Sequence, residues 1–204
     1  MAMIRIYGQM MSRAPRCLWA AEECGVQYQL VPIRLAEGEH RTPAYLAVNP
    51  NGRIPAMEDG DLKLFESMAI NLYLARKYGG TLWPAGETDQ AHTLQWSFWA
   101  ITELEPHLIT ILLQTMLVPE LERRPDRIED ARNALPRPLG VLDAHLAREG
   151  WLAGGRFTIA DLNVASVLIF AQILKMDLSP YGRVKSWLET CLARPAYRKV
   201  MQAS

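Results

Sequence analysis

Cysteine is scarce in this sequence. Among 204 residues there are three cysteines, and no Cys-x-x-Cys pair. An odd number without close spacing argues against a disulfide framework and fits a reducing compartment. The start, "MAMIRIYGQMMSRAPR", carries Arg5 in its first apolar run and shows no apolar segment followed by a cleavage site. We therefore expect no secretory signal and a cytoplasmic protein.

Long apolar runs and an excess of one charge are also missing. The longest apolar stretch, "LNVASVLIFAQIL" from Leu162 to Leu174, is too short to span a bilayer and contains Asn163 and Gln172. It predicts a buried core helix. Lys and Arg number 22 together, and so do Asp and Glu, which gives no bias toward nucleic acid or an anionic membrane. We expect neither as a partner.

Several catalytic motifs are absent as well. His40 lies in a polar loop, and the other three histidines are scattered over expected helices without metal-ligand spacing. There is no Gly-rich phosphate loop and no Gly-x-Ser-x-Gly elbow. We expect no catalytic metal.

The first part of the chain predicts an α+β domain. Alternation and helical spacing indicate a strand, a helix, a second strand, a short helix, a hairpin and a last helix. In order, these are residues 3–7, 14–24, 28–33, 43–48, 54–65 and 67–78. The βαβ order makes the first two strands parallel, and Asp59-Gly60 is expected as the hairpin turn.

The rest of the chain predicts helices only. A glycine-rich segment with a central proline, "GGTLWPAGETD", is the expected linker. Helices are expected at 89–117, 126–148, 158–175, 181–193 and 195–202. We therefore predict a domain over 1–78, a linker over 79–88 and an all-helical domain over 89–204.

Two features of the helical half concern its stability. Pro136 and Pro138 should kink or break the helix that contains them. "TIAD", from Thr158 to Asp161, has the pattern of a capping box, in which a threonine and an acid satisfy the first N–H groups of a helix. Its loss should cost folding rather than chemistry.

Two helix starts in the first domain could hold a ligand. Ser12 and Ser67 each precede or open a helix, where serine commonly caps the free N–H groups. A helix start also stabilises an anion, including a thiolate. If Glu66 is buried beside Ser67, the pair offers a carboxylate for an amine and N–H groups for a carboxylate. From the residues alone, capping is the favoured interpretation of both serines.

The hairpin opens with a proline that cannot donate to a strand ladder. Pro55 therefore marks a sheet edge or a special peptide bond; if that bond is cis, it turns the Ile54 backbone outward for an extended ligand. His40 and Arg41 lie in a polar loop, and by themselves they indicate only a solvated segment.

Together, these segments resemble a known family. "IYG", "SRAPR", "GEHRTPAYLAVNPNGRIPAMEDGDLKLFESMAI", "LWP" and "FTIAD" are similar to the cytosolic glutathione transferases, particularly plant phi-like and bacterial members that use serine. The resemblance covers nearly the whole chain and is densest from Gly38 to Ile70. It implies a thioredoxin-like βαβ-α-ββα domain, an all-α domain, glutathione as co-substrate and a homodimer.

The resemblance also implies roles for individual residues. Ser12 matches the hydroxyl that donates to the glutathione sulfur. The matching peptide-binding positions are His40 and Arg41 for the glycine carboxylate, Arg53 for the peptide, Ile54 and cis Pro55 for the cysteinyl part, and Glu66 and Ser67 for the γ-glutamyl end.

Two other residues could compete for the chemistry. Tyr7 is a rival to Ser12, because other branches of the family use a tyrosine near the end of the first strand. The spacing of "SRAPR" fits the serine branch better. Cys17 falls on the core face of its helix, so the cysteine-dependent thiol transfer of some relatives is not supported.

The expected activity is detoxifying conjugation of glutathione to small hydrophobic electrophiles. The alternatives are a glutathione-dependent isomerase, dehalogenase or peroxidase, and a non-enzymatic glutathione- or ligand-binding protein of the same fold. Six residues could form the electrophile pocket, although each fits the core equally well: Met10, Met11, Trp96, Trp99, His107 and Ile111.

Overall fold

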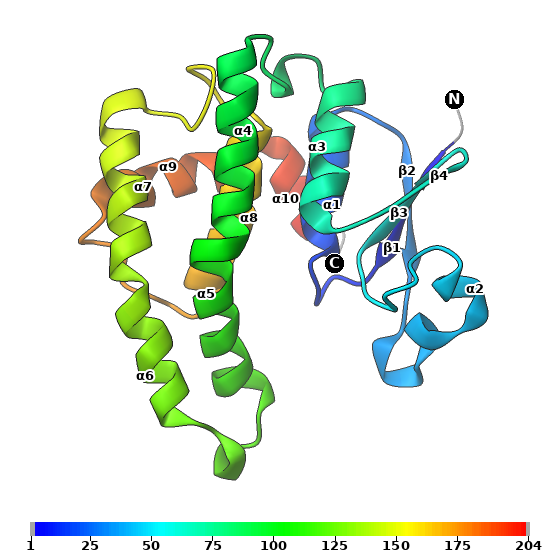
Figure 1. The fold of residues 1–204 in the computed structure, drawn as a ribbon, viewed down its shortest axis with the longest axis horizontal. Coiled ribbons are helices and arrows are strands. Elements are labelled where there is room, and N and C mark those ends of the chain that lie inside the picture. Colours follow the sequence, from blue (N-terminus) through cyan, green and yellow to red (C-terminus); the bar gives the residue numbers. More distant parts are fainter. Residues whose placement is uncertain (1–2, 203–204) are drawn as a thin grey trace. The chain divides into compact units, whose positions relative to one another are not determined.

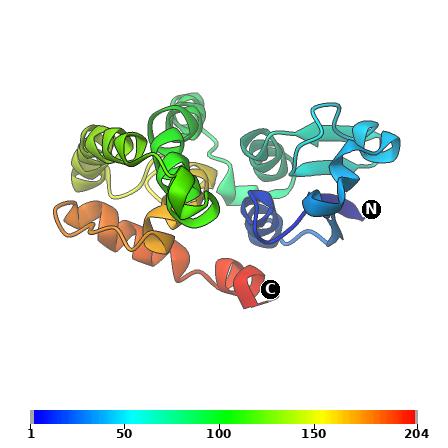
Figure 2. The same ribbon diagram turned by 90° about the horizontal axis from the view of Figure 1, so that it is seen from below.

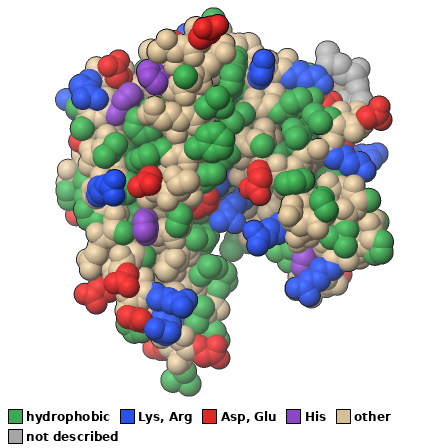
Figure 3. Space-filling view, viewed as in Figure 1, with side chains coloured by type: hydrophobic (Ala, Val, Ile, Leu, Met, Phe, Trp, Pro, Cys, Tyr) green, Lys and Arg blue, Asp and Glu red, His purple; other side chains and the backbone are tan. Residues whose placement is uncertain are grey.

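The computed structural model describes residues 3–202 and divides into two compact units. The N-terminal unit contains the residues up to Trp83 together with those from Ala193 onward, and the helical unit is Pro84–Leu192. On the face seen in Figure 3, basic and acidic side chains are interspersed. No helix among the described residues is long and apolar enough to cross a membrane.

A four-stranded mixed sheet forms the centre of the N-terminal unit (Figure 1). Its strands are β1 (Ile4–Gly8), β2 (Tyr28–Pro32), β3 (Ala56–Asp59) and β4 (Leu62–Phe65), in the order β2-β1-β3-β4. β1 and β2 are parallel, as the sequence predicts, and the other two pairs are antiparallel. The sheet therefore has one parallel crossover and one hairpin.

Helices cover both sides of this sheet (Figures 1 and 2). α1 (Ala14–Glu23) and α3 (Ser67–Tyr78) pack together on one face. The segment on the other side holds two 3-10 turns, Leu35–Glu37 and Glu39–Arg41, and the short α2 (Pro43–Leu46). The predicted order of elements is confirmed for this part of the chain.

Side chains alternate across β1 and separate the two faces. Ile4 and Ile6 are buried, while Tyr7 packs with a cluster that includes Tyr45 of α2. Since successive strand residues point to opposite faces, Ile4 and Ile6 face α1 and α3, and Tyr7 faces the α2 side.

The hairpin turn lies one residue later than the sequence predicts. Asp59 still pairs with Leu62, so the two-residue loop is Gly60-Asp61 rather than Asp59-Gly60. Gly60 takes a φ of 61°, which glycine adopts without steric cost.

The last helix, α10 (Pro195–Gln202), packs against α1 in the N-terminal unit. The rings of Trp19 and Tyr197 lie 5.0 Å apart, and Arg194 makes two hydrogen bonds of 2.6 and 2.7 Å to the largely buried carboxylate of Glu23. The domain boundaries predicted from the sequence place this helix in the helical half instead. Helical periodicity shows that one face is apolar, but it does not show which neighbour covers that face.

The helical unit contains α4 (Glu87–Trp99), α5 (Glu105–Leu112), α6 (Pro125–Ala134), α7 (Pro136–Glu149), α8 (Ile159–Ile173) and α9 (Gly182–Leu192). Within the described part of this half there is no β-strand, and the β structure is limited to one isolated bridge between Ala153 and Arg156. The prediction of an all-helical half is therefore confirmed.

Two of its helices differ from the expected ones. The helix expected over 89–117 is interrupted by π-helical turns at Ala100–Leu104 and Leu113–Leu117. Pro106 lacks an N–H to donate to the carbonyl four residues earlier, which accounts for the first interruption. The helix expected over 126–148 is two helices, because Pro136 opens α7, where the missing N–H costs nothing.

Candidate active site

The sheet register brings four chain segments to one edge. Gly8 pairs with Pro32, Tyr7 with Ala56, and Ala56 with Phe65. The loops after β1 and β2, the loop before β3 and the helix start after β4 therefore all leave the sheet at this edge. These segments carry all the predicted site residues: Ser12, His40, Arg41, Arg53, Ile54, Pro55, Glu66 and Ser67.

Ser12 lies just before α1, half-buried. Its Oγ donates to the carbonyl of Gln9 at 2.6 Å and accepts from the N–H of Ala14 at 3.0 Å. The hydroxyl thus satisfies the first N–H of α1, as a serine near a helix start is expected to do. An N–H donated to Oγ also polarises the hydroxyl and makes it a stronger donor.

Gly8 allows α1 to begin close to the end of β1. A Cβ at position 8 would lie 2.4 Å from the Cβ of Ala14, which is far inside the contact distance. A side chain here would push apart the strand and the helix start that hold Ser12.

We expect Gly8→Ala to lower the free energy of unfolding by about 2 kcal/mol, because overpacking displaces the backbone. Adding Ala14→Gly should recover most of this loss, although glycine in the first helical turn costs up to about 1 kcal/mol by itself. Urea denaturation of the two single variants and the double variant measures the coupling. If the double variant instead loses the sum of the two single-variant losses, the contact between positions 8 and 14 does not cause the destabilisation by Gly8→Ala.

Tyr7, the rival to Ser12, has its hydroxyl engaged elsewhere. Its Oη donates to Oε2 of Glu58 at 2.6 Å. Burial raises the pKa of Tyr7, and the hydrogen bond and charge of Glu58 raise it further. The ring also points to the α2 side of the sheet, opposite α1.

Side chains of the N-terminal unit stabilise the loop before β3 through hydrogen bonds to its main chain. The Ile54–Pro55 bond is cis, which confirms the prediction. The carbonyl of Arg53 accepts two hydrogen bonds, from Oη of Tyr45 and from Nδ2 of Asn49, each 2.6 Å long. Within residues 3–202, neither the N–H nor the carbonyl of Ile54 forms a hydrogen bond. The sequence did not indicate these two supporting side chains, although asparagine before a Pro-Asn-Gly turn is a residue that bonds nearby backbone.

Glu66 and Ser67 differ from their expected environments. Glu66 is exposed, so the prediction of a buried acid is wrong: it occupies the corner between β4 and α3, with φ 70° and ψ 114°. Such a conformation costs a non-glycine residue about 1–3 kcal/mol and occurs often at functional sites. Ser67 is the first residue of α3, is 6% exposed and makes no capping hydrogen bond, so a cap is also the wrong interpretation.

The basic residues of the site have few internal partners. His40 and Arg41 end a 3-10 turn, and Nδ1 of His40 is buried without a hydrogen bond in the described structure. Arg41 and Arg53 are exposed, and neither side chain forms an ion pair within residues 3–202. The guanidinium groups of Arg41 and Arg53 are therefore available to an anionic ligand.

The cysteines do not supply a reactive thiolate here. Cys17 is fully buried on the core face of α1, as predicted, and its Sγ lies 3.8 Å from the carbonyl oxygen of Ser67. Burial raises the pKa of Cys17 to about 12. Among the described residues, no group of three or more His, Cys, Asp and Glu side chains could hold a metal ion.

The suggested electrophile-pocket residues are dispersed. Trp96 and Ile111 are buried in the core of the helical unit, and Trp96 packs edge-to-face on Trp99. Met10 is half-buried, and Met11 is 89% exposed.

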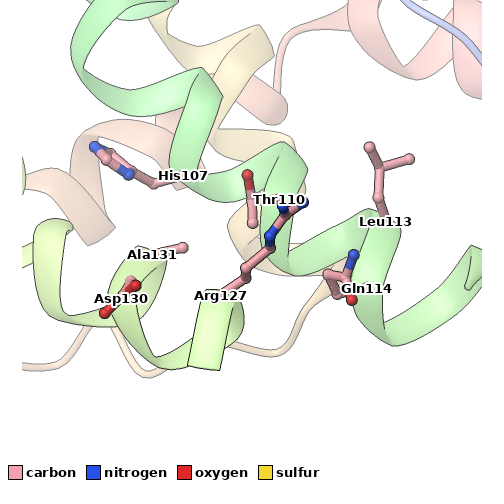
Figure 4. A pocket seen from close by; sticks show the side chains of 7 residues that line it. All are labelled: His107, Thr110, Leu113, Gln114, Arg127, Asp130 and Ala131. Atoms are coloured by element: carbon pink, nitrogen blue, oxygen red, sulfur yellow. The ribbon is translucent and has the colours of Figure 1, made fainter. Parts of the chain in front are cut away.

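His107 lines a hollow of about 440 Å³ between α5 and α6 (Figure 4). The full lining is His107, Thr110, Leu113, Gln114, Arg127, Asp130 and Ala131. In Figure 4 the Arg127 side chain extends toward Thr110. Of the six suggested residues, His107 is the one that lines this hollow.

The fold and the edge site together define a thioredoxin-like domain with a cis-proline, joined to an all-helical unit. Residues 2–76 match the family described as "Glutathione S-transferase, N-terminal domain", and residues 104–195 match "Glutathione S-transferase, C-terminal domain". The chain belongs to the glutathione S-transferase family.

Individual relatives match along nearly their whole length. The chain is 38% identical to glutathione S-transferase 3 of Zea mays, over 100% of this chain and 95% of that protein. It is similar to a solved glutathione S-transferase-I bound with lactoylglutathione, with a TM-score of 0.90, 35% identity and 98% of both chains covered. A theta-class enzyme of Xanthomonas axonopodis pv. citri with glutathione bound gives a TM-score of 0.89 at 34% identity, covering 98% of this chain and 97% of that one.

Proposed function

We propose that this protein activates the thiol of glutathione and joins its sulfur to small hydrophobic electrophiles. One observation carries the proposal: a single sheet edge holds the unpaired main-chain groups of Ile54 together with charged side chains, Arg41, Arg53 and Glu66, that have no partner in the described structure. Such groups fit a ligand that is itself charged at both ends and has a peptide backbone between them.

Glutathione has that chemistry. At its glycine end, His40 and Arg41 would bind the carboxylate. Its cysteinyl part would pair with the N–H and carbonyl of Ile54 as an added strand does, with Arg53 beside the peptide.

The γ-glutamyl end carries an ammonium and a carboxylate on the same carbon. Glu66 would bind the ammonium, and the Ser67 hydroxyl with the N–H groups of the first turn of α3 would bind the carboxylate. The positive φ of Glu66 turns the chain directly into that helix start.

Ser12 would stabilise the thiolate. A thiol with a pKa of about 8.5 is only ~3% ionised at pH 7, and a pKa lower by about two units makes the thiolate the major form. This shift needs about 2.7 kcal/mol, which one hydrogen bond to a charged sulfur and the start of α1 can supply. The proton leaves to solvent, and the Ser12 O–H turns from the Gln9 carbonyl to the sulfur while Ala14 N–H stays on Oγ. The sulfur lone pair then forms a C–S bond to the electrophile; with an aromatic halide, the carbon–halogen bond breaks and halide leaves to solvent with the bonding electron pair.

The bound ligands of two solved relatives, lactoylglutathione and glutathione, are consistent with this assignment. The direct test is retention of the protein on immobilised glutathione, followed by assay with an aromatic halide and product analysis. We expect retention, loss of free glutathione and a conjugate. Turnover that returns glutathione unchanged would indicate an isomerase, and retention without turnover would indicate a binding protein.

We further propose that the protein is a homodimer, as the family resemblance implies. Each unit exposes large apolar side chains that a second copy could cover: Leu62 and Phe65 on β4, and Leu94 and Phe98 on α4. Sedimentation analysis should give twice the chain mass, and a monomer at micromolar concentration would contradict the proposal.

A further inference from the structure

Tyr45 lies beneath the peptide-binding edge, in a position that no part of the proposed chemistry uses. We infer that its hydroxyl is a positioning group that aims the Ile54 N–H at the ligand, and so sets the affinity for the tripeptide. The inference rests on the proposed glutathione site and adds to it a residue that does not touch the ligand.

One peptide group joins the Arg53 carbonyl to the Ile54 N–H. The carbonyl of Arg53 and the N–H of Ile54 belong to the same plane, and this peptide bond is trans, since the one cis bond of the described chain is Ile54–Pro55. In a trans peptide the C=O and N–H point in opposite directions. Whatever holds the Arg53 carbonyl inward therefore holds the Ile54 N–H outward.

Two side chains hold the Arg53 carbonyl in place. Its two lone pairs are both used, by Oη of Tyr45 and by Nδ2 of Asn49, at 2.6 Å each. Two donors on one oxygen restrict rotation of the plane about its flanking bonds, whereas a single donor leaves it free to tilt.

The ring of Tyr45, which carries one of these donors, is held rigidly by packing. Tyr45 is 4% exposed and packs with Ile33, Val48 and Ala56. Its ring meets that of Tyr7 edge-to-face, with centroids 6.0 Å apart. Because the ring is fixed by packing, a phenylalanine would fill the same space and remove only the hydroxyl.

The experiment compares Tyr45→Phe with a matched control, Tyr73→Phe. Tyr73 also donates a 2.6 Å hydrogen bond within the N-terminal unit, but to Asp59 at the other end of β3, away from the site edge. Calorimetry with S-methylglutathione as the probe measures affinity without any contribution from thiol ionisation. Steady-state kinetics measure KM for glutathione, KM for the electrophile and kcat.

We expect Tyr45→Phe to raise Kd for S-methylglutathione and KM for glutathione about 5- to 10-fold, because the ligand must then align the loosened peptide plane, at a cost bounded by the net contribution of the lost hydrogen bond. Its kcat and its KM for the electrophile should not change, and Tyr73→Phe should bind like the wild type. Equal affinity of Tyr45→Phe and wild type would overturn the inference, as would equal weakening by both variants, which would indicate a general loss of stability. If the wild type itself fails to bind the probe or glutathione, the proposed function falls and the inference with it.

Discussion

Replacing Ser12 by alanine is expected to lower kcat/KM about 8-fold at pH 7. The expected cause is a rise of about 1.5 units in the pKa of bound glutathione, because the hydrogen bond is lost while the start of α1 remains; the thiolate then falls from about three quarters to ~9% of the bound form. The loss should shrink as pH rises and nearly vanish above pH ~9, where both enzymes hold glutathione as thiolate. A pH–rate profile for wild type and variant measures this directly.

Tyr7→Phe is the control for that experiment. It removes a hydroxyl that donates to Glu58 and faces the α2 side of the sheet, so the pH–rate profile should keep its position. If Tyr7→Phe shifts the profile and Ser12→Ala leaves it unchanged, the two residues have the opposite roles.

Replacing Asp161 by alanine should have the largest effect on stability. Its carboxylate is fully buried and accepts four hydrogen bonds, from the N–H groups of Leu152 and Thr158, the Thr158 hydroxyl and Nε1 of Trp187. The capping box predicted from the sequence is confirmed at the start of α8. Removing the acceptor leaves these buried donors without a partner, so we expect a loss of about 3–5 kcal/mol.

Thermal and urea denaturation measure this loss. Asp126→Ala is the matched control, because Asp126 also lies in the first turn of a helix but is exposed, and its ion-pair partner Arg124 is exposed too. It should change stability little. If Asp161→Ala is as stable as this control, the hydrogen bonds described above do not hold the helical unit together.

Asp161 should also make stability depend on pH. Burial raises its pKa to about 6, against the pull of its hydrogen bonds. Because this value lies above the ~3.9 of an unfolded aspartate, its contribution is greatest below pH ~4 and is lost as pH rises through about 6. The stability difference between wild type and Asp161→Asn should therefore be larger at pH 4 than at pH 7, and a difference that grows with pH would contradict this.

The local elements of the fold were predictable because each is marked by particular residues. Gly25 follows the end of α1, Ser67 opens α3, and Thr158 with Asp161 begins α8. Pro136 breaks the chain into two helices, as its ring predicts, so the error there is the single helix expected over 126–148. The hairpin turn was also misplaced, because the strand pairing of Asp59 moves it by one residue.

Tertiary relations were less accessible. The amphipathic pattern of 195–202 indicates a helix but not that it covers α1. Likewise the sequence identifies Glu66 but not its exposure, because a sharp corner with positive φ cannot be inferred from a residue other than glycine.

The residues of the candidate site were predicted from the resemblance to a family. The side chains that support the site were not predicted. Ser12, Ile54 and Ser67 lie in a recognisable motif, and the sheet register brings their segments to one edge. Tyr45 and Asn49 act through the carbonyl of Arg53, a main-chain atom that no side-chain pattern reports.

We expect a tripeptide bound at this sheet edge to ionise its thiol more easily than it does in water, because Ser12 donates to the sulfur. Titration of the ultraviolet absorbance of the thiolate, in the complex of wild-type protein with glutathione, tests it most directly. We expect a bound pKa near 6.5, about two units below that of a free thiol. A bound pKa of about 8.5 or above would contradict it.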